Sequence, residues 1–493
     1  MKDIKLEYLS ASEIGRLVNN KQITPTEVLD YFIERINKYN DKVNAFVYTK
    51  FDYAYEKAKE LESRLNKGEN LGVFAGVPFA LKDFLPSKKG WTHTYGGVKC
   101  LERVDEVDSL FCKVMEENGG IAIGKVNAPS YGFRGVTDNL MYGATKNPFN
   151  PKYNAGGSSG GSSSAVASGL VPIAEGGDAG GSIRVPASCC NLVGFVAGFG
   201  SIPMVNRPDA FSATHPYCVE GGLVKTVEDS INLYKLMAKY NSRDPYNNMV
   251  LRKWDEFDSI INSNKKLKIA LTYDFDIFMV EDEVKEVVSN AVNKFMDAGC
   301  EVSLVHFNFK YSANEFSEAW CKGITIDCAN ELNMFKEKGF DYLKTNKLDF
   351  PSEFIKYKKL CDKLTIRDLY DFNLVRTDIL DNFENVFENY DLIISPVMCT
   401  LPIKNKTNGV TKGPDKINGV KVESLVGWCE TFLVNFVSYP SVSVPAGIAS
   451  HKLPIGMQII GKKFDEATVL YAAKVYESIN PWTKYYKISL NNK

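Results

Sequence analysis

The chain reads "NAGGSSGGSSSAVASGLVPIAEGGDAGGSIRVPAS" over residues 154–188, with nine glycines and eight serines among these 35 residues. They gather in two bursts, "GGSSGGS" and "GGDAGGS", on either side of "AVASGLVPIA", which is apolar enough to favour burial. A flexible linker would lack such an apolar segment. We therefore interpret this stretch as part of the folded core, where it could serve as a hinge, a phosphate cradle or a catalytic site.

Generic motifs explain the two bursts poorly. Neither burst matches the P-loop or the dinucleotide-binding fingerprint. The pentapeptide "GGSSG" at 156–160 fits G-x-S-x-G, the nucleophile elbow of α/β-hydrolases, but that elbow needs a preceding strand. Here "NPFNPKYNA" precedes it, which is typical of a loop. The chain also has only four histidines, none in an evident catalytic context: His93, His215, His306 and His451.

The spacing of the bursts favours a catalytic arrangement of a different kind. "SSSAVASG" predicts a short helix ended by Gly169, and "LVPIA" predicts a strand that returns the chain toward the sheet. Such a path can bring the two bursts side by side, so that Ser158 and Ser182 face each other. Glycines at Gly180 and Gly181 would let the backbone turn tightly and point N–H groups inward, as in an oxyanion hole.

A serine nucleophile without a histidine needs another base, and the candidate is Lys82. It ends the apolar run "GVPFAL" and precedes a turn. A single lysine after a strand can equally be a solvated surface charge. To act as a neutral base near pH 7, the pKa of a lysine must fall by about 3 units, which costs roughly 4 kcal/mol. Desolvation by apolar walls can supply that shift.

The remaining chain indicates an α/β protein. Ser10 with Glu13, and Thr24 with Glu27, form capping boxes that predict two helices near the N-terminus. Short apolar runs then alternate with helical patterns, which favours helices packed on a mostly parallel or mixed sheet. Residues 306–375 are helical, polar and rich in aromatics. They predict either amphipathic helices on the sheet or a cap that walls a substrate pocket.

Composition excludes several classes of function. The chain has 59 basic and 60 acidic side chains and no basic stripe, which argues against a nucleic-acid-binding protein. No stretch approaches the length of a membrane span, and no secretion signal precedes the first helix. Eleven cysteines without C-x-x-C pairs indicate reduced thiols and no zinc site. We expect a soluble, cytoplasmic protein.

Several segments together resemble one known family. "GVPFALKD", "GGSSGGSSSAVASGL" and "GGDAGGSIRVPAS" occur in the order and spacing of the amidase signature family. The resemblance spans nearly the whole chain and includes "GATKNPFNP" and "SVSVPAGIASHKLPIGMQIIGKKFDEATVL". It implies a Ser–Ser–Lys triad in which Ser182 is the acylated nucleophile and Ser158 bridges it to the base, Lys82. In this family the bridging serine follows a cis peptide.

The resemblance also implies a supporting frame for the triad. The oxyanion would be held by the backbone amides of Ala179, Gly180, Gly181 and Ser182. Hydrogen bonds that brace the loops would come from Ser159, Asp178 and Arg184. The implied fold is a large mixed sheet flanked by helices on both faces, with an aromatic-rich helical cap. Its expected parts are an N-terminal helical segment (1–70), the catalytic core (71–305), the cap (306–390) and a C-terminal part of the same domain (391–493).

The implied activity is hydrolysis of the C–N bond in a small linear or cyclic carboxamide, through a serine acyl-enzyme, without metal or cofactor. Length and the final "ESINPW" favour the 6-aminohexanoate-cyclic-dimer hydrolase type. Alternatives are the glutaminase component of an aminoacyl-tRNA amidotransferase, an amidase-fold transacylase of secondary metabolism, and a catalytically silent binding scaffold. We expect a small-molecule amide as partner, with no nucleic acid or membrane, and leave a homodimer open.

Three departures from the family pattern put the substrate in doubt. After "LVGF" a Lys-Pro-Thr type segment is usual, whereas this chain has "VAGFGSIP" at 196–203. A segment that usually resembles "GPLAR" reads "GGLVK" at 221–225, and Ser130 replaces a commonly acidic residue. The loss of polar side chains at 196–203 argues against the glutaminase component of an amidotransferase.

Overall fold

The computed structural model describes residues 5–85, 87–247, 254–407 and 409–487. Their main feature is an 11-stranded sheet that contains both parallel and antiparallel neighbours. In spatial order its strands are β1 (Phe46–Thr49), β5 (Ile121–Val126), β2 (Pro78–Lys82), β6 (Ile173–Asp178), β8 (Val219–Val224), β7 (Val193–Val196), β14 (Ser441–Ile448), β15 (Pro454–Gly461), β11 (Leu392–Pro396), β9 (Lys268–Leu271) and β10 (Glu301–Leu304). The predicted large mixed sheet is therefore confirmed.

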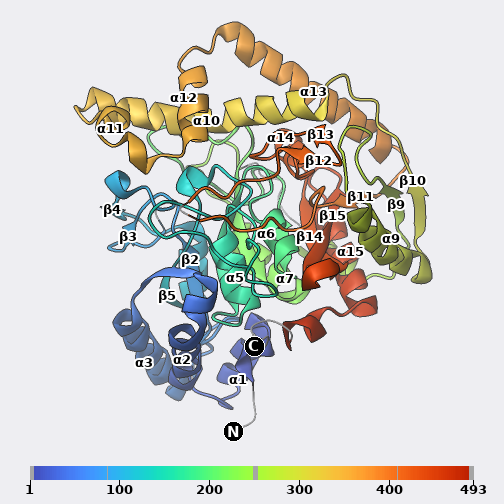
Figure 1. Ribbon diagram of the computed structural model, residues 1–493. Coiled ribbons are helices and arrows are strands. Elements are labelled where there is room, and N and C mark those ends of the chain that lie inside the picture. The colour runs from blue at the N-terminus through green and yellow to red at the C-terminus, as the bar shows by residue number, and fades with distance from the viewer. Residues whose placement is uncertain (1–4, 86, 248–253, 408, 488–493) are drawn as a thin grey trace.

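The described part of the chain contains fifteen α-helices. Eleven pack on or beside the sheet: α1 (Ala11–Asn19), α2 (Pro25–Val43), α3 (Phe51–Asn66), α4 (Leu110–Glu117), α5 (Gly160–Ala167), α6 (Arg184–Cys189), α7 (Val227–Met237), α8 (Trp254–Ile261), α9 (Asp282–Asp297), α14 (Phe432–Val437) and α15 (Glu466–Ile479). Four others, the cap helices, lie together at one end of the molecule, opposite α2 and α3 (Figure 1): α10 (Ala313–Glu337), α11 (Tyr342–Thr345), α12 (Ser352–Cys361) and α13 (Ile366–Phe387).

Smaller elements complete the fold. Two short ribbons pair β3 (Thr92–His93) with β4 (Arg103–Val104) and β12 (Lys416–Ile417) with β13 (Val420–Lys421). The 3₁₀ helices span Leu6–Tyr8, Lys99–Leu101, Ser130–Gly132, Lys347–Asp349, Ser450–Lys452 and Thr483–Lys487. No helix in the described ranges is long and apolar enough to cross a membrane.

The N-terminal capping boxes form as predicted. The Ser10 side chain accepts from the Glu13 amide at the start of α1, and Thr24 does the same for Glu27 at the start of α2. The N-terminal segment is not only helical, because β1 adds an edge strand to the sheet by pairing antiparallel with β5.

The pairing of β2, β5 and β6 places the candidate site. These strands run parallel, and β2 and β5 are buried along their whole length, which agrees with sequences that are apolar except for one lysine each. Parallel strands end at the same edge of a sheet, where ligands of α/β proteins usually bind. Lys82 is the last residue of β2, and the loop after β6 carries Ser182. Lys82 and the second burst therefore meet at one edge.

The segment between the bursts differs from the prediction in one respect. The short helix forms as α5, and Gly169 after it has a positive φ of 67°. The following strand begins at Ile173 rather than at Leu170, and it runs on to Asp178. Pro172 has no N–H to donate to a sheet ladder, which explains the later start.

Candidate active site

The structure joins Lys82 and Ser158. The Lys82 side chain is 4% exposed, and its Nζ lies 2.7 Å from Ser158 Oγ. Ser158 follows Gly157 through a cis peptide and precedes α5. The alternative of a solvated surface lysine is wrong, because the apolar run of β2 carries Lys82 into the interior.

The surroundings of Lys82 favour an uncharged amine. Burial lowers its pKa to about 7, although the carboxyl groups of Glu175 and Asp178 and the Cys218 thiol act in the opposite direction. The ring of Phe84 lies 5.3 Å from Nζ. A lysine with a pKa near 7 is neutral in a large fraction of molecules at neutral pH, so it can accept a proton.

Ser182 lies in the loop between β6 and α6, and its side chain is half-buried. The amide of Ser159 donates to the carbonyl of Ser182 over 3.2 Å, which ties the two bursts together. Within the described residues, Ser182 Oγ makes no hydrogen bond to Ser158 Oγ. Catalytic hydrogen bonds are often loose in free enzymes and tighten when substrate binds. The structure therefore brings both serines to one edge without closing the contact between their hydroxyls.

The expected oxyanion donors are not all free. The Gly181 amide donates to Asp178 Oδ1 over 2.8 Å, because the Asp178 carboxylate folds back under the loop. This amide is therefore already engaged, which departs from the expected set of four. The amides of Ala179, Gly180 and Ser182 donate to no group among the residues that the structure describes. These three remain available to a ligand.

Asp178 and Arg184 form the buried frame of this loop. Arg184 Nη2 lies 2.9 Å from Asp178 Oδ1, and Asp178 Oδ2 accepts from the Ile183 amide over 3.0 Å. Burial alone would raise the pKa of Asp178, but the charge and hydrogen bonds of Arg184 lower it to about 2. Arg184 also donates to Gln458 and Asn435. Both side chains thus make the bracing contacts expected of them.

Ser159 contributes to the frame differently from what we expected. Its hydroxyl is buried and has no hydrogen-bond partner in the described part of the chain. The contact that it makes to the second burst comes from its backbone amide. Any bracing by Ser159 is therefore a property of the main chain.

Comparisons with known proteins decide the family. The family model described as Amidase matches residues 27–470. The chain belongs to the amidase family.

The relatives of this amidase cover nearly its whole length. A curated acylamidase from Rhodococcus erythropolis is 29% identical over 98% of both chains. The A component of a glutamyl-tRNA(Gln) amidotransferase from Geobacillus stearothermophilus is 32% identical over 96% of this chain and 98% of its own. Among solved structures, a bacterial aryl acylamidase of the amidase signature family is 37% identical, with a TM-score of 0.95 over 99% of both chains. A 6-aminohexanoate cyclic dimer hydrolase complexed with substrate is 25% identical, with a TM-score of 0.83 over 98% of both.

The resemblance to the amidase signature family is thus confirmed, and the chain is an amide hydrolase that acts on C–N bonds other than peptide bonds. The 6-aminohexanoate cyclic dimer hydrolase is a structural neighbour, as the sequence indicated, but the aryl acylamidase is more similar in both sequence and fold.

The nucleophile-elbow alternative gains no support from this amidase. Among the described residues no histidine hydrogen-bonds to Ser158 or Ser182. The segment before Ser158 is a loop and not a strand. The described residues also include no group of three or more His, Cys, Asp or Glu side chains arranged to hold a metal ion.

At the departures from the family pattern, the hydrogen bonds among the described residues do not involve the three residues of the expected triad. In the turn after β7, the Gly198 amide and the Ser201 hydroxyl both donate to Glu466. Lys225 points its Nζ at backbone carbonyls near the N-terminus, including that of Leu9 at 3.4 Å. The Ser130 hydroxyl donates to the Gly96 carbonyl. These groups hydrogen-bond to other parts of the fold.

Sequence reasoning missed three residues that hold the loop 179–183, called here the catalytic loop, and one that holds the end of β2 at Lys82. Trp320 of α10 donates from Nε1 to the Ala179 carbonyl, and Thr431 donates to the Gly180 carbonyl over 2.7 Å. Asn435 donates to Asp178, and Glu175 accepts from the Lys82 amide, each pair over less than 3.0 Å. The sequence held a signal for two of them. Thr431 and Asn435 are polar residues four apart in the apolar run "TFLVNFV", so they would share one face of a helix.

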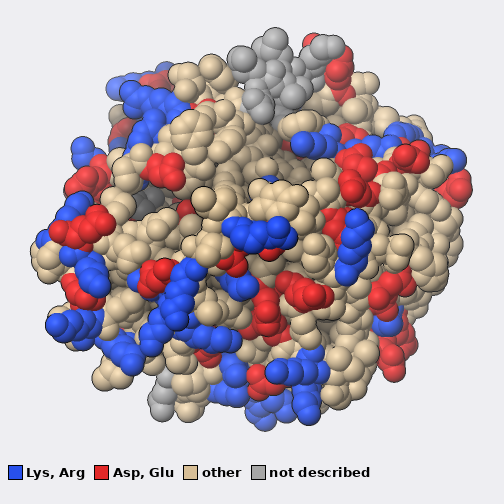
Figure 2. All heavy atoms as spheres, turned by 90° about the horizontal axis from the view of Figure 1, so that it is seen from above, with Lys and Arg blue, Asp and Glu red and all other residues tan. Residues whose placement is uncertain are grey.

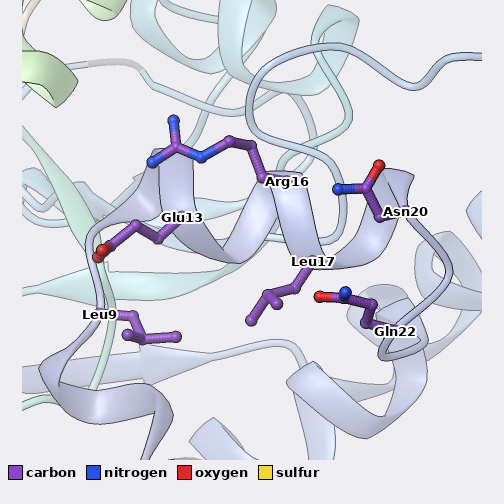
Figure 3. A pocket seen from close by; sticks show the side chains of 6 residues that line it. All are labelled: Leu9, Glu13, Arg16, Leu17, Asn20 and Gln22. Carbon is purple, nitrogen blue, oxygen red and sulfur yellow. The ribbon is translucent and has the colours of Figure 1, made fainter.

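A separate hollow of about 330 Å³ opens beside α1 and has no evident role (Figure 3). Its two charged side chains are already engaged, because Glu13 caps α1 and Arg16 pairs with Glu228 over 2.7 Å. None of its lining residues belongs to the edge where Lys82 and Ser182 meet.

Removing the charge of Asp178 should destabilise the protein strongly. In Asp178→Asn the buried guanidinium of Arg184 loses its counter-charge, so we expect the free energy of unfolding to fall by about 3–5 kcal/mol. Urea titration followed by circular dichroism measures this change. The matched control is Glu228→Gln, which breaks the exposed pair with Arg16 and should cost no more than about 1 kcal/mol. Equal costs for the two variants would contradict the assigned role of Asp178.

Proposed function

We propose that this amidase hydrolyses small N-aryl amides through a relay of Lys82, Ser158 and Ser182. The observation that carries the proposal is the buried contact of 2.7 Å between Lys82 Nζ and Ser158 Oγ. No other described lysine shares a hydrogen bond with a serine of the two bursts. Because the Lys82 pKa is lowered to about 7, this contact can transfer a proton at neutral pH.

The relay follows from what each group can accept and donate. In its neutral form, Lys82 accepts the hydroxyl proton of Ser158, and Ser158 in turn accepts the proton of Ser182. Ser182 Oγ then attacks the amide carbonyl carbon, and the resulting oxyanion accepts hydrogen bonds from loop amides. The same path returns a proton to the nitrogen, which leaves as an amine. Water hydrolyses the acyl-enzyme by the reverse sequence.

Aromatic side chains beside the serines support an aryl substrate. Tyr131 stacks on Phe354 of α12 with ring centroids 4.8 Å apart, and it precedes Gly132. A Cβ atom on Gly132 would lie 3.4 Å from Ser158 Oγ, so this aromatic cluster adjoins the bridging serine. Trp320 covers the loop that precedes Ser182. The predicted role of the cap as a substrate wall agrees with these contacts, and the similarity to an aryl acylamidase points the same way.

A substrate panel tests the proposed class. The purified chain is assayed alone with 4-nitroacetanilide, a cyclic diamide and glutamine at equal concentrations. We expect kcat/KM for the anilide to exceed that for the other two by at least tenfold. A preference for the cyclic diamide would support the 6-aminohexanoate-cyclic-dimer type, and a preference for glutamine would overturn the aryl assignment.

The glutaminase component of an aminoacyl-tRNA amidotransferase remains the second candidate, because such a relative is 32% identical to this chain over nearly its whole length. Ammonia release from glutamine by the chain alone, and its increase with the other amidotransferase components, would favour it. Transacylation is tested in the same assay by adding an amine acceptor and searching for a new amide by mass spectrometry. Cytoplasmic location and a homodimer remain predictions.

Activity should depend on pH through Lys82. The base works only when neutral, so with a pKa of about 7 we expect kcat to fall about tenfold per unit below pH 6.5 and to reach a plateau above pH 8. Initial rates with 4-nitroacetanilide between pH 5 and pH 9 measure this profile, with unfolding checked at each pH. A kcat that is flat over this range would contradict a titrating amine.

A further inference from the structure

A side chain of the cap helix α10 reaches the loop between β6 and α6. Trp320 is 4% exposed, and its indole Nε1 donates to the Ala179 carbonyl over 2.8 Å. A Cβ atom at position 180 would lie 2.6 Å from the indole ring, so the ring lies directly against the backbone of Gly180. Only glycine permits this approach. The close contact with the ring, and not a positive φ, is therefore what requires glycine at position 180.

The indole hydrogen bond fixes the orientation of a peptide plane. In a trans peptide, the carbonyl of one residue and the N–H of the next point in opposite directions. The Ala179–Gly180 peptide is trans, since the described cis bonds lie elsewhere. When Trp320 holds the Ala179 carbonyl, the Gly180 N–H must therefore point away from the indole. That N–H donates to no group in the described residues.

The next peptide, between Gly180 and Gly181, is also held through its carbonyl, but its N–H is not left free. Thr431 Oγ1 donates to the Gly180 carbonyl over 2.7 Å, which turns the Gly181 N–H toward Asp178. The Gly181 N–H is thus bound to the Asp178 carboxylate. The Gly180 N–H, whose peptide is held by the cap, has no acceptor among the described residues. Of the two glycine amides, only that of Gly180 is free to receive an oxyanion.

We propose that Trp320 is a positioning residue of this amidase, whose indole N–H fixes the Ala179–Gly180 peptide so that the Gly180 amide stabilises the oxyanion. The inference rests on the proposed function, since it assumes that Ser182 is acylated. It makes α10 a part of the catalytic frame as well as a wall of the site. Trp320 acts through the backbone and does not itself contact the reacting atoms.

The test removes the indole N–H and keeps an aromatic ring. Deleting one oxyanion donor from a protease lowers kcat by about 10²–10³-fold, so misplacing one should lower kcat by roughly ten- to hundredfold. In Trp320→Phe we expect that loss in kcat, with KM within about twofold of the wild type. The affinity for phenylboronic acid, whose tetrahedral serine adduct places an oxygen in the oxyanion position, should fall with kcat.

Trp482→Phe is the matched control. Its Nε1 also donates to a backbone carbonyl, that of Lys225 over 2.9 Å, and its side chain is 1% exposed. This variant loses the same atoms from an equally buried site outside the catalytic loop, so its kcat and boronate affinity should match the wild type. If Trp320→Phe fails to fold, replacing Trp320 with the isosteric sulfur analogue benzothienylalanine deletes the N–H alone and gives the same readouts.

Each outcome has a distinct meaning. Unchanged kcat in the Trp320 variants, or a rise in KM alone, would overturn the inference and leave Trp320 as a packing or substrate-contact residue. A loss in kcat with unchanged boronate affinity would also overturn it. Ser182→Ala is measured in parallel: if that variant stays active, the proposed function fails, whereas an inactive Ser182→Ala beside a normal Trp320→Phe defeats only this inference.

Discussion

Lys82→Met should lower kcat by about 10³–10⁴-fold, because it removes the base and leaves a side chain of similar length in a site that already favours apolar groups. KM should change little, since the amine takes part in proton transfer and not in binding. The measurement is the initial rate with 4-nitroacetanilide. The unfolding midpoint should stay close to that of the wild type, because Met needs no charge compensation in a buried site.

His451→Ala is the control for a histidine mechanism. His451 is exposed and its ring stacks on Tyr153, so its loss should leave kcat within about twofold. Turnover that survives Lys82→Met but collapses in His451→Ala would favour the nucleophile-elbow interpretation over the lysine relay.

Ser182→Ala should abolish acylation, and Ser158→Ala should slow it. A fluorophosphonate probe is expected to label Ser182 in the wild type, because only the nucleophile forms the covalent adduct. In Ser158→Ala the nucleophile remains but its proton path to Lys82 is broken, so labelling of Ser182 should slow by about 10²–10⁴-fold. Intact-mass and peptide mass spectrometry measure both the rate and the site of labelling.

Ser164→Ala supplies the control for this labelling experiment. Ser164 lies on α5, and its hydroxyl donates to the Lys146 carbonyl over 2.8 Å, away from the relay. Its labelling rate should equal that of the wild type. An adduct on Ser158 in the wild type would reverse the assigned roles of the two serines, and the lack of any adduct would favour a silent binding scaffold.

Local patterns predicted the local structure well. The capping boxes at Ser10 and Thr24 form because each depends on residues within one helical turn. The apolar strand before Lys82 favoured its burial, but the sequence left a solvated position open. The start of β6 was not, although Pro172 carried the necessary signal in its missing N–H. The even distribution of charge is also visible on the molecular surface, where basic and acidic side chains are interspersed on the face seen in Figure 2.

Contacts between distant segments could not be read from the chain. Trp320 and Ala179 are 141 residues apart, so no periodicity links the indole to the catalytic loop. The engagement of the Gly181 amide by Asp178 depends on the path of the backbone, which two glycines leave undetermined at the sequence level. The resemblance to a family predicted the triad residues, and the structure adds which groups contact them.

Direct titration of Lys82 tests the central claim. The protein is labelled with lysine enriched in ¹³C at the ε position, and the Lys82 resonance is assigned by its absence in Lys82→Met. The account predicts an amine that titrates with a pKa of about 7 in the folded protein. A Lys82 resonance that remains that of a charged ammonium at pH 9 would contradict it.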